Sequence, residues 1–173
     1  MINAKSRDSI TELAFFRTVR AWEAFLEETF ILYLLGQQSP RGRKAHRYGF
    51  PPSEKAAYEW VADGRSYANW NPENVRSRSK RLFRNGHPYE PVLSAHQNLL
   101  HQIKTVRNAI AHESADAQAK FEAVVRNELA ALPPNTTVGS FLLTTKPRTN
   151  PPVSYFEFYI DKIALAAATI VPL

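Results

Sequence analysis

An arginine and a histidine near the end of one helical segment are the residues of this chain best suited to chemistry. They belong to the run Arg107-Asn108-Ala109-Ile110-Ala111-His112. A guanidinium binds phosphate in a fixed fork geometry, and an imidazole can transfer a proton near neutral pH. Together the two side chains predict chemistry on a phosphate group, and RNA is the substrate that we expect.

The helix that carries these residues is predicted from about Val92 to His112. Projected at about 100° per residue, Asn108 and His112 lie one turn apart on the face opposite the apolar stripe. Arg107 is expected at the flank between the stripe and that outer face. The three side chains can therefore converge above a surface that the helix does not bury. The stripe itself, at spacings of four, three and four residues, consists of Leu99, Ile103, Val106 and Ile110.

A long helix is predicted at the start of the chain. It begins at a capping box formed by Ser9 and Glu12 and ends at Gly36. At ~1.5 Å per residue it would be about 40 Å long, a length that suits a bundle. Its predicted inward positions are Leu13, Phe16, Val19, Phe25, Leu26, Thr29, Leu32 and Tyr33.

The rest of the chain is also predicted to be mainly helical. Residues 133–153 hold five of the 12 prolines and form an irregular segment, in which Phe141-Leu142-Leu143 is expected to be a short strand or a turn. We therefore predict one all-α domain over residues 1–173, an up-and-down bundle of about five to six helices. The remaining helices are expected at 53–63, 71–84 and 115–132, and from about Ser154 onward, where Phe156, Ile160, Ile163, Leu165 and Ala168 are expected to be buried.

The composition describes an ordered, basic protein. The 173 residues are 44% hydrophobic, and 22 Lys and Arg against 16 Asp and Glu leave a formal net charge of +6, which favours a polyanionic partner. The absence of cysteine excludes disulfides and thiolate metal sites. No signal peptide or membrane span is recognisable, so a cytoplasmic location without membrane contact is expected.

A family resemblance rests on three segments. Arg107-Asn108, followed by three residues and His112, resembles the Arg-x4-6-His motif of the HEPN superfamily. Residues 20–27 are similar to the opening helix of several prokaryotic HEPN groups, and residues 66–75 to the connector of the toxin-type groups. The resemblance extends from about Ser9 to His112.

The resemblance implies a small helical bundle that forms a homodimer, with the two motifs facing each other in a cleft. Many HEPN proteins are metal-independent endoribonucleases that act as toxins or in phage defence. Arg107 would bind phosphate, His112 would be the catalytic histidine, and Asn108 would help to hold the site. The implied partners are RNA, a second copy of the chain and an antitoxin or companion protein, and no cofactor or metal is implied.

One position departs from a subset of the family. Some HEPN toxins carry a tyrosine two residues after the histidine, and a partner nucleotidyltransferase modifies it. Here that position is Ser114. Control directed at such a tyrosine is therefore not expected.

Charged residues elsewhere supply supporting candidates. Arg20, Glu23 and Glu27 lie along one side of the first helix, where a carboxylate can orient Arg107; the alternative is a solvated Arg20–Glu23 pair. His96 and His101 have a poor spacing for a metal site. Basic residues that can follow an RNA backbone, or simply be solvated, are Arg41, Arg43, Lys44, Arg47, Arg76, Arg78 and Lys80.

Two other functions remain open. One is a non-catalytic HEPN-like module that binds RNA, a nucleotide or a protein through the same cleft. The other is a structural adaptor that uses the polar face of the Arg107 helix as an interface.

Overall fold

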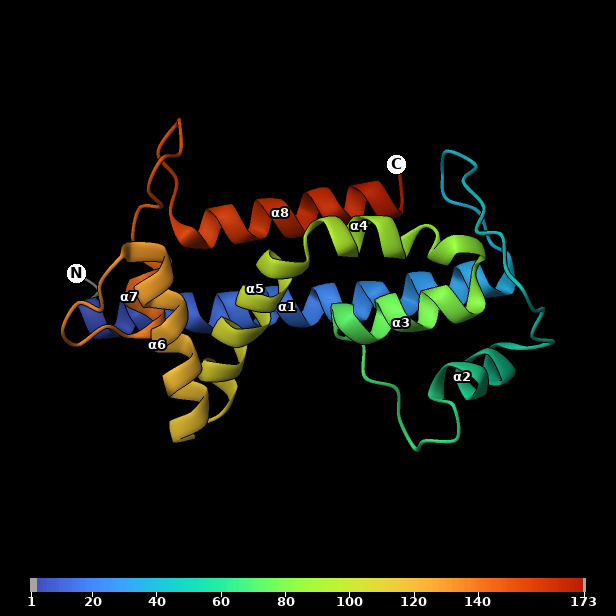
Figure 1. Ribbon diagram of the computed structural model, residues 1–173, viewed down its shortest axis with the longest axis horizontal. Helices are drawn as coiled ribbons and strands as arrows, with labels where there is room; N and C mark the ends of the chain where they lie inside the picture. The colour runs from blue at the N-terminus through green and yellow to red at the C-terminus, as the bar shows by residue number, and fades with distance from the viewer. Residues whose placement is uncertain (1–2, 173) are drawn as a thin grey trace. The chain divides into compact units, whose positions relative to one another are not determined.

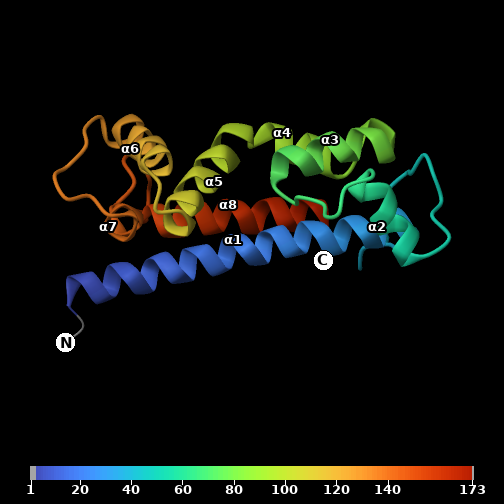
Figure 2. The same ribbon diagram turned by 90° about the horizontal axis from the view of Figure 1, so that it is seen from below.

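The computed structural model describes residues 3–172, and its longest element is helix α1 (Ala4–Leu35), unbroken over 32 residues (Figure 2). The helix starts after Asn3, whose Oδ1 accepts the backbone N–H of Ser6 at 2.8 Å. The capping box predicted at Ser9 is therefore wrong. Glu12 instead accepts the backbone N–H of Gly139 at 2.8 Å.

The all-α prediction is confirmed, since β pairing among the described residues is limited to isolated bridges. These residues form eight α-helices, two more than the sequence indicated (Figure 1). After α1 come α2 (Glu54–Ala62), α3 (Pro72–Leu82), the 3-10 turn η1 (Arg84–Gly86), α4 (Tyr89–Ala95), α5 (Gln97–Ala111), α6 (Ala115–Leu129), α7 (Val138–Leu143) and α8 (Tyr155–Ile170).

The two additional helices arise in two places. The helix predicted over 92–112 is divided at His96, whose φ of −112° and ψ of 16° end α4 before α5 begins. The segment 141–143, expected to be a strand or turn, lies in α7. There Thr137 is the N-cap, and its Oγ1 accepts the N–H of Ser140 at 2.9 Å. Burial of Phe141 stabilises this short helix.

The inward faces of α1 and α8 match the prediction only in part. Val19, Leu26 and Tyr33 of α1 and Ile163 of α8 are buried as expected. Leu13 and Leu32 are each 50% exposed, and Leu165 is 52% exposed. Large aromatic side chains that were not predicted to be inward are also buried: Phe15, Trp22 and Phe30 in α1, and Tyr155 and Tyr159 in α8.

The chain divides into two compact units, and α1 and α8 each contribute to both. The first unit comprises the chain up to Arg20 together with Asn98–Ile163. The second comprises Ala21–Gln97 and the chain from Ala164 onward. Each unit has its own aromatic core.

In the first unit, rings from four helices meet. Phe141 of α7 stacks on Tyr155 of α8 with ring centroids 4.5 Å apart, and Phe121 of α6 lies 5.8 Å from Phe141. Phe15 of α1 lies 6.0 Å from Tyr159. Aromatic pairs at these separations stabilise a core beyond the area that they bury.

In the second unit, Phe30 of α1 is the centre of the core. Its ring lies 4.9 Å from Phe83 and 5.1 Å from Tyr89. The Tyr89 hydroxyl donates a hydrogen bond to Thr29 Oγ1 at 3.0 Å, which satisfies a buried polar group. Burial raises the pKa of Tyr89 well above its ordinary value, so this hydroxyl stays protonated.

Candidate active site

Arg107 lies close to the core of the first unit. It follows Ile103 by four residues, on the side of α5 where Ile103 is buried, and is itself half-buried. Its guanidinium carbon lies 5.2 Å from the centre of the Phe16 ring, and Nη1 donates to Asn108 Oδ1 at 3.1 Å. A cation over an aromatic face is attracted to it. Arg107 is thus half-buried, as a flank position implies, and its guanidinium is held by two neighbours.

His112 is the first residue after α5. Its backbone N–H donates to the Asn108 carbonyl at 2.9 Å, so the last turn includes it, and its side chain is exposed. Residues four apart share a helix face, as Asn108 and His112 do. Residues five apart are rotated by about 140°, so Arg107 and His112 of one chain point to different sides of α5.

Ser114 has a structural role. It is the N-cap of α6, and its Oγ accepts the backbone N–H of Ala117 at 3.2 Å. A cap of this kind satisfies one of the four N–H groups that a helix start leaves without an internal partner. The motif is therefore followed directly by the start of another helix.

The three supporting residues of α1 fall in different units. Arg20 is exposed and belongs to the first unit with Arg107, whereas Glu23 and Glu27 belong to the second. Glu27 lies near Tyr58 of α2: burial, and then the charge of Glu27, raise the pKa of the Tyr58 hydroxyl. The expected orientation of Arg107 by a carboxylate stays a prediction.

Two of the four cations in the connector 41–47 are bound to helix ends. Arg43 Nη1 donates to the Thr169 carbonyl in the last turn of α8. Arg47 Nη1 donates to the Leu34 carbonyl in α1 at 2.8 Å. Cations are favoured at such C-termini. Arg41 and Lys44 are exposed and remain the connector's best candidates for contact with RNA.

The cations of α3 also have partners in the protein. Arg76 donates to the Gln97 side chain, and Lys80 forms an ion pair with Glu90 at 3.0 Å. Arg78 donates to the Asn69 carbonyl. An RNA backbone would have to share these side chains with the contacts that hold them now.

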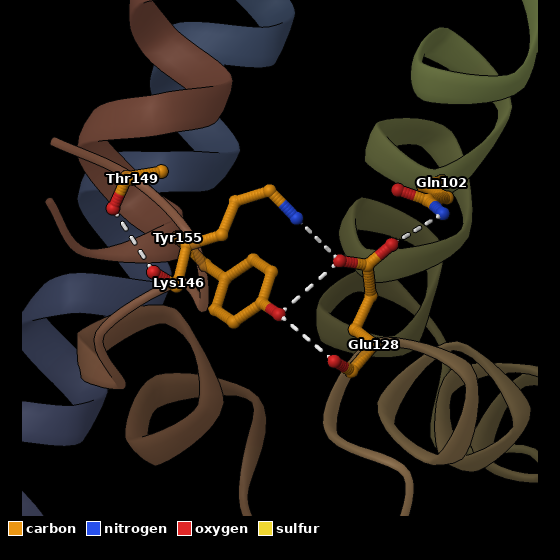
Figure 3. A network of polar contacts seen from close by, with 5 residues as sticks. All are labelled: Gln102, Glu128, Lys146, Thr149 and Tyr155. Carbon is orange, nitrogen blue, oxygen red and sulfur yellow. Dashed lines mark hydrogen bonds and ion pairs between the residues drawn. The ribbon is translucent and has the colours of Figure 1, made fainter.

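The sequence reasoning missed a polar cluster in the first unit (Figure 3). Glu128 of α6 lies at its centre: one carboxylate oxygen accepts Gln102 Nε2 at 2.9 Å, and the other accepts Lys146 Nζ at 2.6 Å and the Tyr155 hydroxyl at 3.1 Å. The lysine comes from the proline-rich segment, in the loop that the bridge between Thr145 and Ser154 closes. No spacing rule relates these residues, since Lys146 and Glu128 are 18 positions apart across an irregular segment.

The cluster stabilises the fold and is unsuited to proton transfer at neutral pH. Burial by itself would raise the pKa of Glu128, but hydrogen bonds from Lys146 and Gln102 outweigh it and lower that pKa. Burial, followed by the charge of Glu128, raises the pKa of Tyr155. The carboxylate therefore stays ionised and the phenol stays protonated. Together with Lys146 they hold the proline-rich loop against α6.

Comparisons of the chain with family models, curated proteins and solved structures found no match. Within residues 3–172, no three acidic or histidine side chains gather as a metal site requires. None of the helices in that range has both the length and the apolar character needed to cross a membrane.

Proposed function

We propose that this chain is a metal-independent endoribonuclease of the HEPN type, acting as a homodimer in a cytoplasmic toxin or phage-defence role. The observation that carries the proposal is the end of α5, where Arg107 is held by Asn108 and Phe16 and His112 is exposed. A held guanidinium can stabilise the transition state of metal-free RNA cleavage, and an accessible imidazole can transfer a proton in it.

The chemistry divides between the two side chains. His112 takes the proton from a ribose 2′-hydroxyl, whose oxygen then attacks the adjacent phosphorus. Arg107 stabilises the negative charge that gathers on the phosphoryl oxygens in the transition state. The 5′-oxygen of the next nucleotide leaves with a proton, and the product on the other side is a 2′,3′-cyclic phosphate.

A second protomer removes two difficulties. One histidine cannot easily act as base and acid in the same step, and in one chain Arg107 and His112 point to different sides of α5. A two-fold cleft supplies two copies of each side chain, so that one imidazole accepts a proton while the other donates one. This arrangement is part of the proposal, as are RNA as the substrate and an antitoxin as a further partner.

The test is cleavage of end-labelled RNA in the presence of EDTA. We expect the wild-type chain to cut RNA and His112→Ala to be slower by at least about a hundredfold, the scale of a lost general base. His101→Ala is the matched control, because His101 is an exposed histidine of the same helix. Equal cleavage by wild type and His112→Ala, or a strict need for a divalent metal, would refute the proposal.

A growth assay separates the nuclease from a binding module. A nuclease toxin inhibits growth when it is expressed, and His112→Ala relieves the inhibition. RNA binding without cleavage, together with growth that His112→Ala leaves unchanged, would instead assign the α5 end to a non-catalytic HEPN-like module.

A further inference from the structure

A pocket in the second unit lies outside the α5 site. It has a volume of about 210 Å³ and is formed by the end of α2, the turn that follows and one side of α3. Asp63 adopts a left-handed conformation with φ of 56°, and Gly64 follows with φ of +76°. This reversal turns the chain back and brings Arg65 to the pocket wall. The polar residues that line the pocket are Asp63, Arg65, Asn74, Ser77, Arg78 and Arg81.

The pocket is strongly positive. Three arginines line it against one aspartate, which leaves a surplus of two positive charges. The single carboxylate is already engaged, because Asp63 Oδ2 lies 2.6 Å from Arg81 Nη1. Like charges gathered at one concave surface repel one another unless an anion is present.

Two of the three guanidinium groups are held in place. Arg78 lies with its guanidinium carbon 5.2 Å from the centre of the Trp70 ring, and it donates to the Asn69 carbonyl. Arg81 Nη2 donates to the Trp60 carbonyl at 3.0 Å. A guanidinium has five N–H donors, so each of these arginines keeps donors for a ligand. Donors fixed before binding lose little entropy when the ligand arrives.

The electrostatics of Arg78 support an anion site. Burial, followed by the positive charges of Arg81 and Arg65, lowers the pKa of Arg78. Arg65 and Arg81 therefore both act on Arg78 across the pocket. An anion bound there would relieve this repulsion.

We propose that the pocket binds a phosphate monoester, the group at the end of a nucleotide or at the 5′ end of an RNA. A monoester carries close to two negative charges at neutral pH, which matches the surplus of the pocket, whereas a backbone diester carries only one. Arginine forks suit phosphate oxygens, and Asn74 and Ser77 offer further donors. The volume of the pocket is sufficient for a phosphate with part of its sugar. The inference is independent of the proposed ribonuclease activity.

Titration calorimetry on the His112→Ala protein, in which cleavage is removed from the measurement, tests the proposal. The probes are adenosine, adenosine 5′-monophosphate, inorganic phosphate and a five-nucleotide RNA with or without a 5′-phosphate. We expect the phosphorylated member of each pair to bind at least about tenfold more tightly, the effect of one charge-assisted contact of ~1.4 kcal/mol. A larger gain in affinity from the 5′-phosphate in the RNA pair than in the adenosine pair identifies an RNA end as the source of the phosphate, and the reverse identifies a free nucleotide.

Variants locate the binding. Arg65→Gln removes an exposed arginine, and Arg78→Lys keeps the charge but loses the fork; each is expected to reduce the preference for the phosphorylated probe by roughly tenfold. Arg84→Gln is the matched control, since Arg84 is exposed in η1 and does not line the pocket. Circular dichroism checks that each variant is folded.

Binding should also weaken below about pH 6, where the monoester dianion takes up a proton and keeps only one negative charge. Equal affinity for phosphorylated and unphosphorylated probes would overturn the proposal. The proposal would also be overturned if Arg84→Gln and Arg65→Gln reduced the preference for the phosphorylated probe to the same extent. Either result leaves the ribonuclease proposal untouched, because cleavage is measured separately.

Discussion

The Glu128 carboxylate shows how one side chain can connect stability to pH. Its pKa is lowered in the folded protein because hydrogen bonds from Lys146 and Gln102 outweigh the effect of burial. A carboxyl group with a lowered folded pKa binds protons more weakly in the folded state than in the unfolded state. Its contribution to stability is therefore present above the unfolded pKa and is lost as the pH falls through the folded value.

Glu128→Gln should lower the free energy of unfolding by about 1–3 kcal/mol at pH 7, because Lys146 loses its ionised partner. The difference from wild type should shrink as the pH falls below the ordinary pKa of glutamate, about 4.3, because the wild-type carboxyl group then takes up a proton more readily in the unfolded state than in the folded state. Urea denaturation at several pH values measures both effects. Glu122→Gln is the control, since its i,i+4 pair with Arg126 on the same helix is worth only a few tenths of a kcal/mol. If the difference in free energy of unfolding between Glu128→Gln and wild type stayed constant down to pH 3, ionised Glu128 would not be the source of the stability.

The chemistry of the α5 end was more accessible to sequence reasoning than its geometry. Neighbouring positions in the chain place Arg107 beside Asn108, and the structure has this contact. Phe16 is distant in sequence, and no pattern linked it to Arg107. Projection of α5 alone therefore gave the flank position of Arg107 but not the ring over which its guanidinium lies.

At the scale of elements, Gly139 makes the contact between α7 and the start of α1 possible. A Cβ atom at Gly139 would lie 2.5 Å from the Asp8 carbonyl oxygen. A hydrogen bond stabilises the same contact: the Thr137 hydroxyl donates to Asp8 Oδ2 at 2.8 Å. A backbone atom of a long helix cannot move aside as the end of a flexible side chain can.

Gly139→Ala should therefore lower the free energy of unfolding by about 1–3 kcal/mol, the usual cost of overpacking. Hydrogen exchange should report faster opening of the amides of α7, because that helix must shift. Ser94→Ala, on an exposed site of α4, should change stability by less than about 0.5 kcal/mol. An unchanged stability in Gly139→Ala would show that α7 does not need this close approach.

Helix ends with a strong local signal were predicted well. Ser53 and Asn71 are N-caps as expected, and each side chain accepts the backbone N–H three residues on, at 3.2 and 2.9 Å. Such caps depend on a few neighbouring residues, so a sequence contains the information directly. At Ser9 the same signal was misleading, because Asn3 caps the helix earlier and Glu12 has a tertiary partner in Gly139.

Helix faces were predicted less well because α1 has apolar residues on more than one side. Leu13 and Phe15 both fit a helical repeat, yet Leu13 is 50% exposed and Phe15 is fully buried. The choice depends on partners that are distant in sequence, such as Tyr159 against Phe15. A local pattern cannot decide between two apolar faces when tertiary contacts do.

At the scale of the whole molecule, the proposed nuclease site needs two chains. A mixed dimer of wild type and His112→Ala contains a single copy of the His112 side chain, so its cleft cannot supply a base and an acid together. Adding His112→Ala protein to wild type should therefore reduce cleavage per wild-type chain, by up to several-fold when the variant is in excess. The measurement is the initial rate of RNA cleavage after subunit exchange, with a protein that does not bind RNA as the control. A rate per wild-type chain that does not change with added variant would indicate a site complete within one protomer.

The shared use of α1 and α8 has a consequence for synthesis on the ribosome. The second unit contains the end of α8, where the Tyr33 hydroxyl donates to the Ile170 carbonyl at 3.0 Å across 137 positions. The first unit likewise joins the start of α1 to Tyr159. Neither unit can finish folding before α8 has left the ribosome, so the two cores are completed close together in time. The growing chain therefore presents its aromatic residues to chaperones until α8 has emerged from the ribosome.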